Sequence, residues 1–337
     1  MSQNGGRTFP ITPPLRETSS GTPRQIGVEI EFAGLDCKAA AAIIAQQFGG
    51  IAESIDPYRY LIETTAHGRF IVELDTQFVH PGETSDPVTR ADTEAQRLKD
   101  ALEEGLRTAI GEVTRLYLPT EVVAPPLPIT ALPDLDALAA HLRAAGARGT
   151  RDSVLYAFGL QLNIDMPALD PATVLAYLQA YLVSADWLRQ DIGVDRTRRV
   201  LPFVQPFPRA YMRQVLQPGY APDLASLIDD YLVHNPTRNR DLDMLPLLTW
   251  LAPDRVRAAV DDPRLKARPA LHYRLPDSRI EDPSWSIISE WNRWARTVEH
   301  LAANPGQRQA ACTACLTHIQ QSRLAEWADD ALAWLTS

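Results

Sequence analysis

The spacing of apolar and polar positions changes several times along the chain, and each spacing predicts a type of element. Apolar side chains at every second residue line one face of a β-strand, and apolar side chains every three or four residues line one face of a helix. Period two predicts strands over 24–33, 51–56, 58–65, 69–76, 118–127, 154–165 and 268–274. The helical period predicts helices over 36–48, 87–111, 133–146, 171–190, 223–234, 240–251, 285–303 and 307–335.

The order of these elements predicts the fold class. Strands that mostly follow one another, with helices gathered in the second half, favour an α+β fold with a largely antiparallel sheet. Gly49 ends the first helix, and Asp134 is expected to cap the helix over 133–146. Residues 1–22 are rich in Pro, Thr, Ser, Gly and Arg, a composition that predicts a disordered tail. Pro-rich loops are expected over 201–222 and 262–283.

Two carboxylates stand two positions apart on the first predicted strand. Glu29 and Glu31 therefore project from one face, while Val28, Ile30 and Phe32 occupy the other. Acids on a buried strand are costly unless a cation or hydrogen-bond donors meet them. An edge strand whose polar face meets water explains the pair as well, so this segment alone leaves both interpretations open.

A second acid-bearing strand favours the cation. Glu121 is the lone carboxylate of the apolar run 118–127, so three acids on two core strands predict a divalent-metal site. The strand over 69–76 again sets two acids, Glu73 and Asp75, on one face. A hairpin that faces solvent explains this last pair nearly as well.

Four segments, in this order, resemble the amidoligase family, which is related to glutamate–cysteine ligase and glutamine synthetase. The similarity spans roughly residues 24–302. It implies a curved, antiparallel sheet of the glutamine-synthetase type, whose concave face holds ATP and metal. It also implies a catalytic domain over 23–303 and a C-terminal helical extension over 304–337. The segments are Gly27-Val28-Glu29-Ile30-Glu31-Phe32, Glu121-Val122-Val123-Ala124-Pro125-Pro126-Leu127, Gly159-Leu160-Gln161-Leu162-Asn163-Ile164 and Leu271-His272-Tyr273-Arg274-Leu275-Pro276-Asp277-Ser278-Arg279.

The resemblance implies a reaction and its cofactors. Joining a carboxylate to an amine is uphill in water, so the carboxylate is first phosphorylated by ATP, with Mg²⁺ bridging the phosphates. Mg²⁺ takes oxygen ligands, typically one or two carboxylates together with phosphates and waters. By the family's motifs, Glu29, Glu31 and Glu121 are the expected metal ligands, and Glu73 and Asp75 are further candidates.

One strand departs from the family's pattern. Relatives commonly carry His at one or both of the positions that Gln161 and Asn163 occupy here. An amide still hydrogen-bonds a phosphate or a metal-bound water, but it carries neither a proton nor a positive charge. We expect Gln161 and Asn163 to contact ATP, with altered or lost catalysis as the alternative. The interpretation that these two residues are only a polar pair facing a water-filled cleft is equally open.

The run 268–274 aligns three basic residues on one face. These are Arg268, His272 and Arg274. The planar guanidinium group of arginine can donate paired hydrogen bonds to phosphate oxygens. Arg274 and Arg279 match the family's basic motif and are expected to stabilise the transferring phosphoryl group, with Arg268 binding ATP. His272 is expected to act as a base or an orienting group, although a lone strand histidine is more often structural. The tryptophans at 285, 291 and 294 are expected to pack this strand rather than bind adenine.

Composition excludes several classes of function. The formal net charge is −9, which argues against nucleic-acid binding as the main task. Only three lysines occur, and no Gly-rich Lys-Ser/Thr phosphate loop or Gly-x-Gly-x-x-Gly turn is present. The first 25 residues hold no secretory or membrane segment, so we expect a cytoplasmic protein.

A helical spacing of thiols raises a second metal hypothesis. Cys312, Cys315 and His318 fall on one face of the predicted helix over 307–335. A closed zinc site needs four ligands, and no second Cys or His pair lies near in the sequence. We therefore favour a packed thiol face over zinc.

Taken together, the sequence predicts an ATP- and Mg²⁺-dependent carboxylate–amine ligase that forms an amide, peptide or γ-glutamyl bond. The expected partners are small-molecule or peptide carboxylate and amine substrates, with no nucleic acid and no membrane, and homo-oligomer formation is left open. Two alternatives remain: a phosphotransferase without ligation, and a degenerate fold kept as a binding or scaffold protein, which Gln161 and Asn163 make plausible.

Overall fold

The structure is a computed structural model that describes residues 8–74, 119–150, 158–194 and 204–335. Its strands are Gln25–Phe32 (β1), Ile51–Asp56 (β2), Arg59–Thr65 (β3), Gly68–Leu74 (β4), Thr120–Val123 (β5), Leu127–Pro128 (β6), Leu160–Asp165 (β7), Leu242–Asp243 (β8) and Ala270–Tyr273 (β9). They form one antiparallel sheet in the order β2-β3-β4-β5-β1-β7-β9-β8, and β6 pairs with β1 outside this path. The predicted mixture of helices with a large antiparallel sheet is confirmed.

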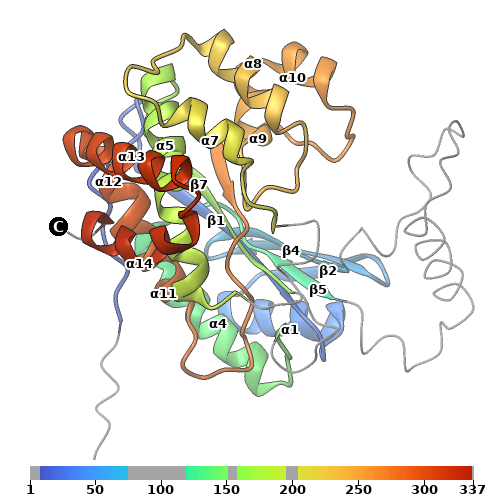
Figure 1. Ribbon diagram of the computed structural model, residues 1–337. Coiled ribbons are helices and arrows are strands. Elements are labelled where there is room, and N and C mark those ends of the chain that lie inside the picture. The colour runs from blue at the N-terminus through green and yellow to red at the C-terminus, as the bar shows by residue number, and fades with distance from the viewer. Residues whose placement is uncertain (1–7, 75–118, 151–157, 195–203, 336–337) are drawn as a thin grey trace, which may run out of the picture.

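The helices flank this sheet. In Figure 1, α5 and α11 to α14 gather on one side of the strands, α1 and α4 lie together at the lower end of the view, and α7 to α10 form a group at the top. The bounds are Cys37–Phe48 (α1), Leu132–Ala144 (α4), Pro171–Ile192 (α5), Arg209–Val215 (α7), Leu224–His234 (α8), Leu245–Leu251 (α9), Pro253–Ala259 (α10), Ile287–Trp294 (α11), His300–Ala303 (α12), Pro305–Gln320 (α13) and Leu324–Leu335 (α14), with a 3₁₀ turn at Ile129–Ala131 and a π-helical segment at Ala295–Glu299.

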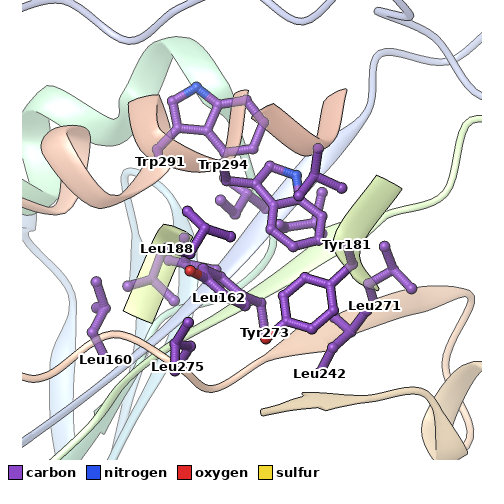
Figure 2. Packing of buried hydrophobic residues seen from close by; sticks show 14 of the residues in the cluster. Leu160, Leu162, Tyr181, Leu188, Leu242, Leu271, Tyr273, Leu275, Trp291 and Trp294 are labelled. Carbon is purple, nitrogen blue, oxygen red and sulfur yellow. The ribbon is translucent and has the colours of Figure 1, made fainter. Parts of the chain in front are cut away.

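The apolar face of the sheet is packed by aromatic side chains. Tyr273 of β9 meets Trp294 of α11 with ring centroids 4.8 Å apart, and Tyr181 of α5 with centroids 5.9 Å apart. Figure 2 shows Trp291 and Trp294 above the side chains of the strands. Both indoles are fully buried, and Trp285 is nearly so. The expectation that these tryptophans pack the strand is therefore confirmed, and the opposite face of the sheet carries the polar residues.

The sheet is uncurled: its path runs from β2 to β8 without closing on itself. Strong curvature requires bulges or glycine kinks at defined points of a sheet. Among the described strands, the register shifts only within the two hairpins of β2, β3 and β4 at one end of the sheet. The central strands pair without interruption, which keeps the middle of the sheet open.

Two predicted helices are each divided. The segment 240–251 forms β8 and then α9, because Pro246 fits only the first turn of a helix and β8 pairs with β9. The segment 307–335 forms α13 and α14, because Ser322 has φ of 59°, in the left-handed region that ends a right-handed helix. Apolar periodicity continues across both breaks, so it did not locate them.

Smaller differences concern caps and short helices. Asp134 lies inside the first turn of α4, whose N-cap is Ala131, and pairs with His67 at 3.1 Å. The helices α7 and α10 have seven residues each, too few for a periodic pattern, and α7 lies in the predicted loop 201–222. The predicted helices 36–48, 171–190 and 223–234 are confirmed with small changes at their ends. The predicted helix 87–111 lies outside the described residues.

Residues 8–22, for which composition predicts disorder, make defined contacts with α11. Asn292 accepts a hydrogen bond from the Ile11 amide at 2.7 Å, and the Trp291 indole donates to the Ile11 carbonyl at 2.8 Å. Just beyond, Arg24 donates two hydrogen bonds of 2.8 Å to Glu299 in the protein interior. Main-chain hydrogen bonds and the packing of Ile11 against the core therefore hold a segment whose composition is polar.

Candidate functional site

Three carboxylates face one another across three neighbouring strands. In the register of the sheet, Glu31 on β1 lies opposite Glu121 on β5, and Glu121 lies opposite Glu73 on β4. Side chains opposite one another in paired strands share a face, and like charges at such positions are destabilising. Glu73 also forms an ion pair with Arg59 at 3.2 Å. The structure thus brings together the acids that the sequence placed on separate strands, on the polar face of the sheet.

Glu31 is held in place by two hydrogen-bond donors from β7 and the residue before it. The backbone amide of Gly159 donates to Oε2 at 2.8 Å, and Gln161 Nε2 donates to Oε1 at 2.9 Å. The same Gln161 nitrogen lies 3.5 Å from Glu121 Oε1. Gln161 therefore bridges two carboxylates and fixes their separation.

A histidine completes this chain of contacts. His272 Nε2 lies 2.6 Å from Gln161 Oε1. The side-chain nitrogen of Gln161 donates to Glu31, so the side-chain oxygen is the atom that faces His272 and accepts a hydrogen bond. We therefore assign the His272 proton to Nε2. Burial first, and then the positive charges of Arg274, Arg268 and Arg238, lower the pKa of His272 well below its ordinary value. The ring is neutral near pH 7 and orients Gln161.

Glu29 has its own set of partners further along the sheet. Asn163 donates to Glu29 Oε1 at 2.8 Å, and its own oxygen accepts from Arg268 at 2.8 Å. Arg268 also lies 3.6 Å from Glu29. Gly27 stands opposite Asn163, and a Cβ at Gly27 would lie 3.3 Å from that of Asn163. Asn163 thus links an acid to an arginine, where the sequence left its contacts open.

The two arginines of the basic motif lie in different places. Arg274 follows β9 on the polar face, and its amide donates to the carbonyl of Asp241 at 2.8 Å. Arg279 instead donates to the Ile192 carbonyl at 3.0 Å and lies 3.7 Å from Glu290 of α11. Arg279 is therefore on the helical side, away from the acids. Of the predicted site residues, Asp75 lies outside the described part of the chain.

The acids as placed do not form a complete metal site by themselves. Within the described residues, no group of three His, Cys, Asp or Glu side chains is arranged to hold a metal ion. Glu29, Glu31, Glu73 and Glu121 share one face, and Glu29 has 12% of its side chain exposed. The face therefore carries several carboxylates in register, without a preformed metal cage among the described residues.

Two residues of this face escape the sequence prediction. Asp243 of β8 lies opposite His272 of β9 and is fully buried, and burial raises its pKa to about 6. Arg238 Nε lies 3.7 Å from Asp243 Oδ2. The signal was present in Asp241-Leu242-Asp243, two acids two positions apart as at Glu29 and Glu31, but the helical period assigned over 240–251 concealed it.

The thiols form a packed face. Cys312 and Cys315 are fully buried in the hydrophobic core. His318 approaches Asp330 of α14 at 3.0 Å and its ring lies 5.3 Å from that of Trp327, rather than meeting the thiols at a metal. The prediction of a packed thiol face is confirmed for both cysteines. Through Trp327, whose indole donates to the Val183 carbonyl at 2.8 Å, α14 is fixed to α5.

Comparison with known proteins identifies one family. The sequence model of a family described as putative amidoligase enzyme matches residues 22–296. The curated proteins compared with the chain gave no match. The matched region contains every strand of the sheet and ends within the π-helical segment, before α12 to α14. Within the described residues, no helix is both long and apolar enough to cross a membrane.

Proposed function

The chain belongs to this putative amidoligase family, and we propose on that ground that it is an ATP-dependent carboxylate–amine ligase acting through an acyl phosphate. A substrate carboxylate oxygen would bond to the γ-phosphorus of ATP as the bond to ADP breaks. The amine nitrogen would then bond to the acyl carbon, phosphate would leave, and the amine would release a proton. The products would be an amide, peptide or γ-glutamyl bond, ADP and phosphate.

One observation carries the proposal: the polar face joins an acidic end to a basic end. The row Glu73, Glu121 and Glu31 occupies β4, β5 and β1, while Arg268 and Arg274 flank β9 two strands away. Phosphoryl transfer from ATP needs both ends, because acids hold the cations that neutralise the phosphates, and arginines stabilise the oxygens of the phosphoryl group in transfer. Gln161 and Asn163 of β7 connect the two ends.

The residues present fit Mg²⁺. Carboxylate oxygen is the donor this hard cation prefers, and in nucleotide sites it needs only one or two carboxylates because phosphates and waters supply the rest. The in-register Glu31 and Glu121 would hold it, with Glu29 and Glu73 beside them. When bound, the cation supplies charge neutralisation of the phosphates. A preformed three-ligand cage is not required for this chemistry.

The protein's own side chains take defined roles in this proposal. Gln161 keeps the carboxylates of Glu31 and Glu121 apart at a fixed spacing, and His272 holds Gln161. Arg274 would contact the phosphoryl group in transfer, and Arg268, oriented by Asn163, would contact ATP. Arg279 receives no role, because its contacts are on the helical side. A relation to the glutamine-synthetase fold and a cytoplasmic location, where ATP and Mg²⁺ are supplied, are parts of the same proposal.

The test measures ADP and phosphate release by the purified full chain with Mg²⁺, ATP and a panel of acids and amines. Release that requires both an acid and an amine is expected. Release with an acid alone would support a phosphotransferase. Absence of ATP binding would support a scaffold protein, an alternative suggested by Gln161 and Asn163, whose amide nitrogens donate to Glu31 and Glu29.

A pair of variants locates the reaction. Glu121→Gln should lower turnover by about a hundredfold or more, about 2.7 kcal/mol in transition-state stabilisation, because the variant loses a ligand charge. Glu63→Gln, on the neighbouring β3 and paired with Arg69 at 2.5 Å, is the control and should leave turnover unchanged. Equal turnover in both variants would contradict the assignment of the acidic row.

A further inference from the structure

Arg238 is an arginine whose contacts with the described part of the chain are incomplete. It stands in the segment between α8 and β8, with 19% of its side chain exposed. Nε lies 3.7 Å from Asp243 Oδ2, and Nη1 lies 3.9 Å from Asp262 Oδ2, both beyond hydrogen-bond length. Within the described residues, the buried Nε has no hydrogen-bond partner. A buried donor without an acceptor costs about 1–3 kcal/mol, so an acceptor from outside would stabilise this arrangement.

Three guanidinium groups gather around Asp243 and His272. Arg238, Arg268 and Arg274 all act electrostatically on the buried Asp243 and on its neighbour His272. His272 is neutral, and the carboxylates near these guanidinium groups in the described residues include Asp243, Glu29 at 3.6 Å from Arg268, and Asp262 at 3.9 Å from Arg238. Burial and then the charge of Arg274 lower the pKa of Arg238, the direction expected where like charges gather.

The residues around Arg238 lie on the same face of the sheet as the proposed reaction. Asp243 lies opposite His272 in the sheet, and His272 contacts Gln161, which contacts Glu31. Arg238 therefore stands at the basic end of the same polar face, on the far side of β9 from the acids. A group bound here would lie next to the proposed ATP and metal positions, not in a separate part of the molecule.

We propose that Arg238, together with Arg268 and Arg274, forms an oxyanion-binding site at β8 and β9 that takes a carboxylate or phosphate group of a substrate. Planar guanidinium forks match both kinds of oxyanion. That the anion is a substrate group rests on the proposed function, whereas the binding of an oxyanion does not. Asp243 beneath the arginines offsets part of their charge.

The experiment titrates the full chain with inorganic phosphate and, separately, with glutarate, by calorimetry without ATP and at constant ionic strength in chloride. Wild type should bind at least one of them. Arg238→Gln should raise the dissociation constant tenfold or more. The control is Arg264→Gln, an exposed arginine whose Nε and Nη2 already hydrogen-bond Asp262 at 2.9 Å each, and it should change the constant less than twofold. Equal constants for Arg238→Gln and wild type would overturn the proposal.

A second variant moves the affinity in the opposite direction. Asp243→Asn removes the negative charge that competes with a bound anion, and it should lower the dissociation constant several-fold. A purely structural role of Asp243 predicts no tightening, so unchanged or weaker binding would count against the site even if Arg238→Gln fails to fold.

The two probes separate the sources of the oxyanion. Preference for phosphate assigns the site to a phosphoryl group, and preference for glutarate assigns it to a substrate carboxylate. No binding of either probe to wild type would overturn the proposal. Binding without any ADP formation in the ligase assay leaves this site intact and overturns the proposed function instead, so the two failures are distinguishable.

Discussion

Gln161 shows at the scale of one residue how an amide organises charged neighbours. Its nitrogen serves Glu31 and approaches Glu121, and its oxygen accepts from a neutral, buried His272. A charged group at this position would interact with both acids, whereas the amide orients them without neutralising them. Gln161 is therefore an orienting group that adds no charge between these carboxylates.

Gln161→Leu tests this orientation. The change leaves the Nε2 proton of His272 without its acceptor inside the protein, so the free energy of unfolding should fall by about 1–3 kcal/mol. Urea denaturation measures it. Gln190→Leu, an exposed residue of α5 that donates to Asp329 at 2.8 Å, is the matched control and should cost clearly less. Equal losses would mean that His272 does not depend on Gln161.

Glu121→Gln should stabilise the protein in the absence of metal while it lowers turnover. Glu121 lies between Glu31 and Glu73 in register, so removing its charge relieves two like-charge contacts and should raise the free energy of unfolding by about 0.2–1 kcal/mol. Chemical denaturation in a chelating buffer is the measurement. Glu63→Gln loses an opposite-charge pair and should move stability slightly the other way. Destabilisation by Glu121→Gln would show that the favourable contacts of its carboxylate outweigh the repulsion from Glu31 and Glu73.

At the scale of elements, local sequence patterns predict the features that depend on a single segment. Strand pairing determines further features that no local pattern contains. The two-residue spacing of Glu29 and Glu31 was enough to place both on one face. That Glu121 lies opposite Glu31 depends on a register between strands almost ninety positions apart, which no local pattern contains. Arg279 shows the converse: β9 ends at Tyr273, so alternation does not extend as far as residue 279, and the Arg279 side chain lies on the helical side.

The predicted helix boundaries are wrong where tertiary contacts override the apolar periodicity. Residues 242 and 243 join the sheet although they continue the apolar spacing of α9, and this hid Asp243 and with it Arg238. The register of the sheet, the left-handed turn at Ser322 and the contacts of the 8–22 segment all depend on partners distant in sequence. Short helices such as α7 and α10 are stabilised by packing and leave little periodic signal.

The helices α13 and α5 enclose thiols that should be unreactive. Burial raises the pKa of Cys312 to about 12 and also raises that of Cys315. Native protein at pH 8 should therefore react with a disulfide reagent at least about a hundredfold more slowly than urea-unfolded protein, since only the thiolate attacks. The double change Cys312→Ser and Cys315→Ser should leave ligase activity intact. Stoichiometric zinc, lost together with activity in that variant, would contradict the packed-thiol interpretation.

At the scale of the whole molecule, one sheet separates two environments. Aromatic and aliphatic side chains fill the face beneath α5 and α11, and ionisable groups fill the other, acidic toward β4 and β5 and basic toward β8 and β9. The net charge of −9 conceals this local arrangement. A protein that brings a cation and an oxyanion together needs such a division, because ligands of opposite sign then bind side by side without sharing protein groups.

Burial of carboxyl groups across the molecule predicts how its stability depends on pH. Burial raises the pKa of Asp136 and of Asp243 to about 6, from an ordinary 3.8. Between about pH 4 and 6 these two carboxyl groups hold protons in the native protein that the unfolded chain has released, so their contribution to the free energy of unfolding falls as pH rises. His272, whose pKa is lowered, contributes in the opposite sense below its ordinary value of 6.5. Asp170 and Asp223 have lowered pKa values and also act in the opposite sense, but only as pH falls below their ordinary range.

Asp136→Asn should make this decline shallower by roughly 1–3 kcal/mol, the linkage value of one to two pKa units. Asp136 Oδ1 accepts from the Ile287 amide at the start of α11, at 2.6 Å, and an asparagine oxygen can keep that contact without titrating. Urea denaturation at several pH values from 4 to 7 gives the slope. Asp223→Asn, which keeps the N-cap of α8, is the control and should leave the decline between pH 4 and 6 as in wild type. An Asp136→Asn profile parallel to that of wild type over this interval would show that the Asp136 carboxyl is already ionised in the native state and would contradict its raised pKa.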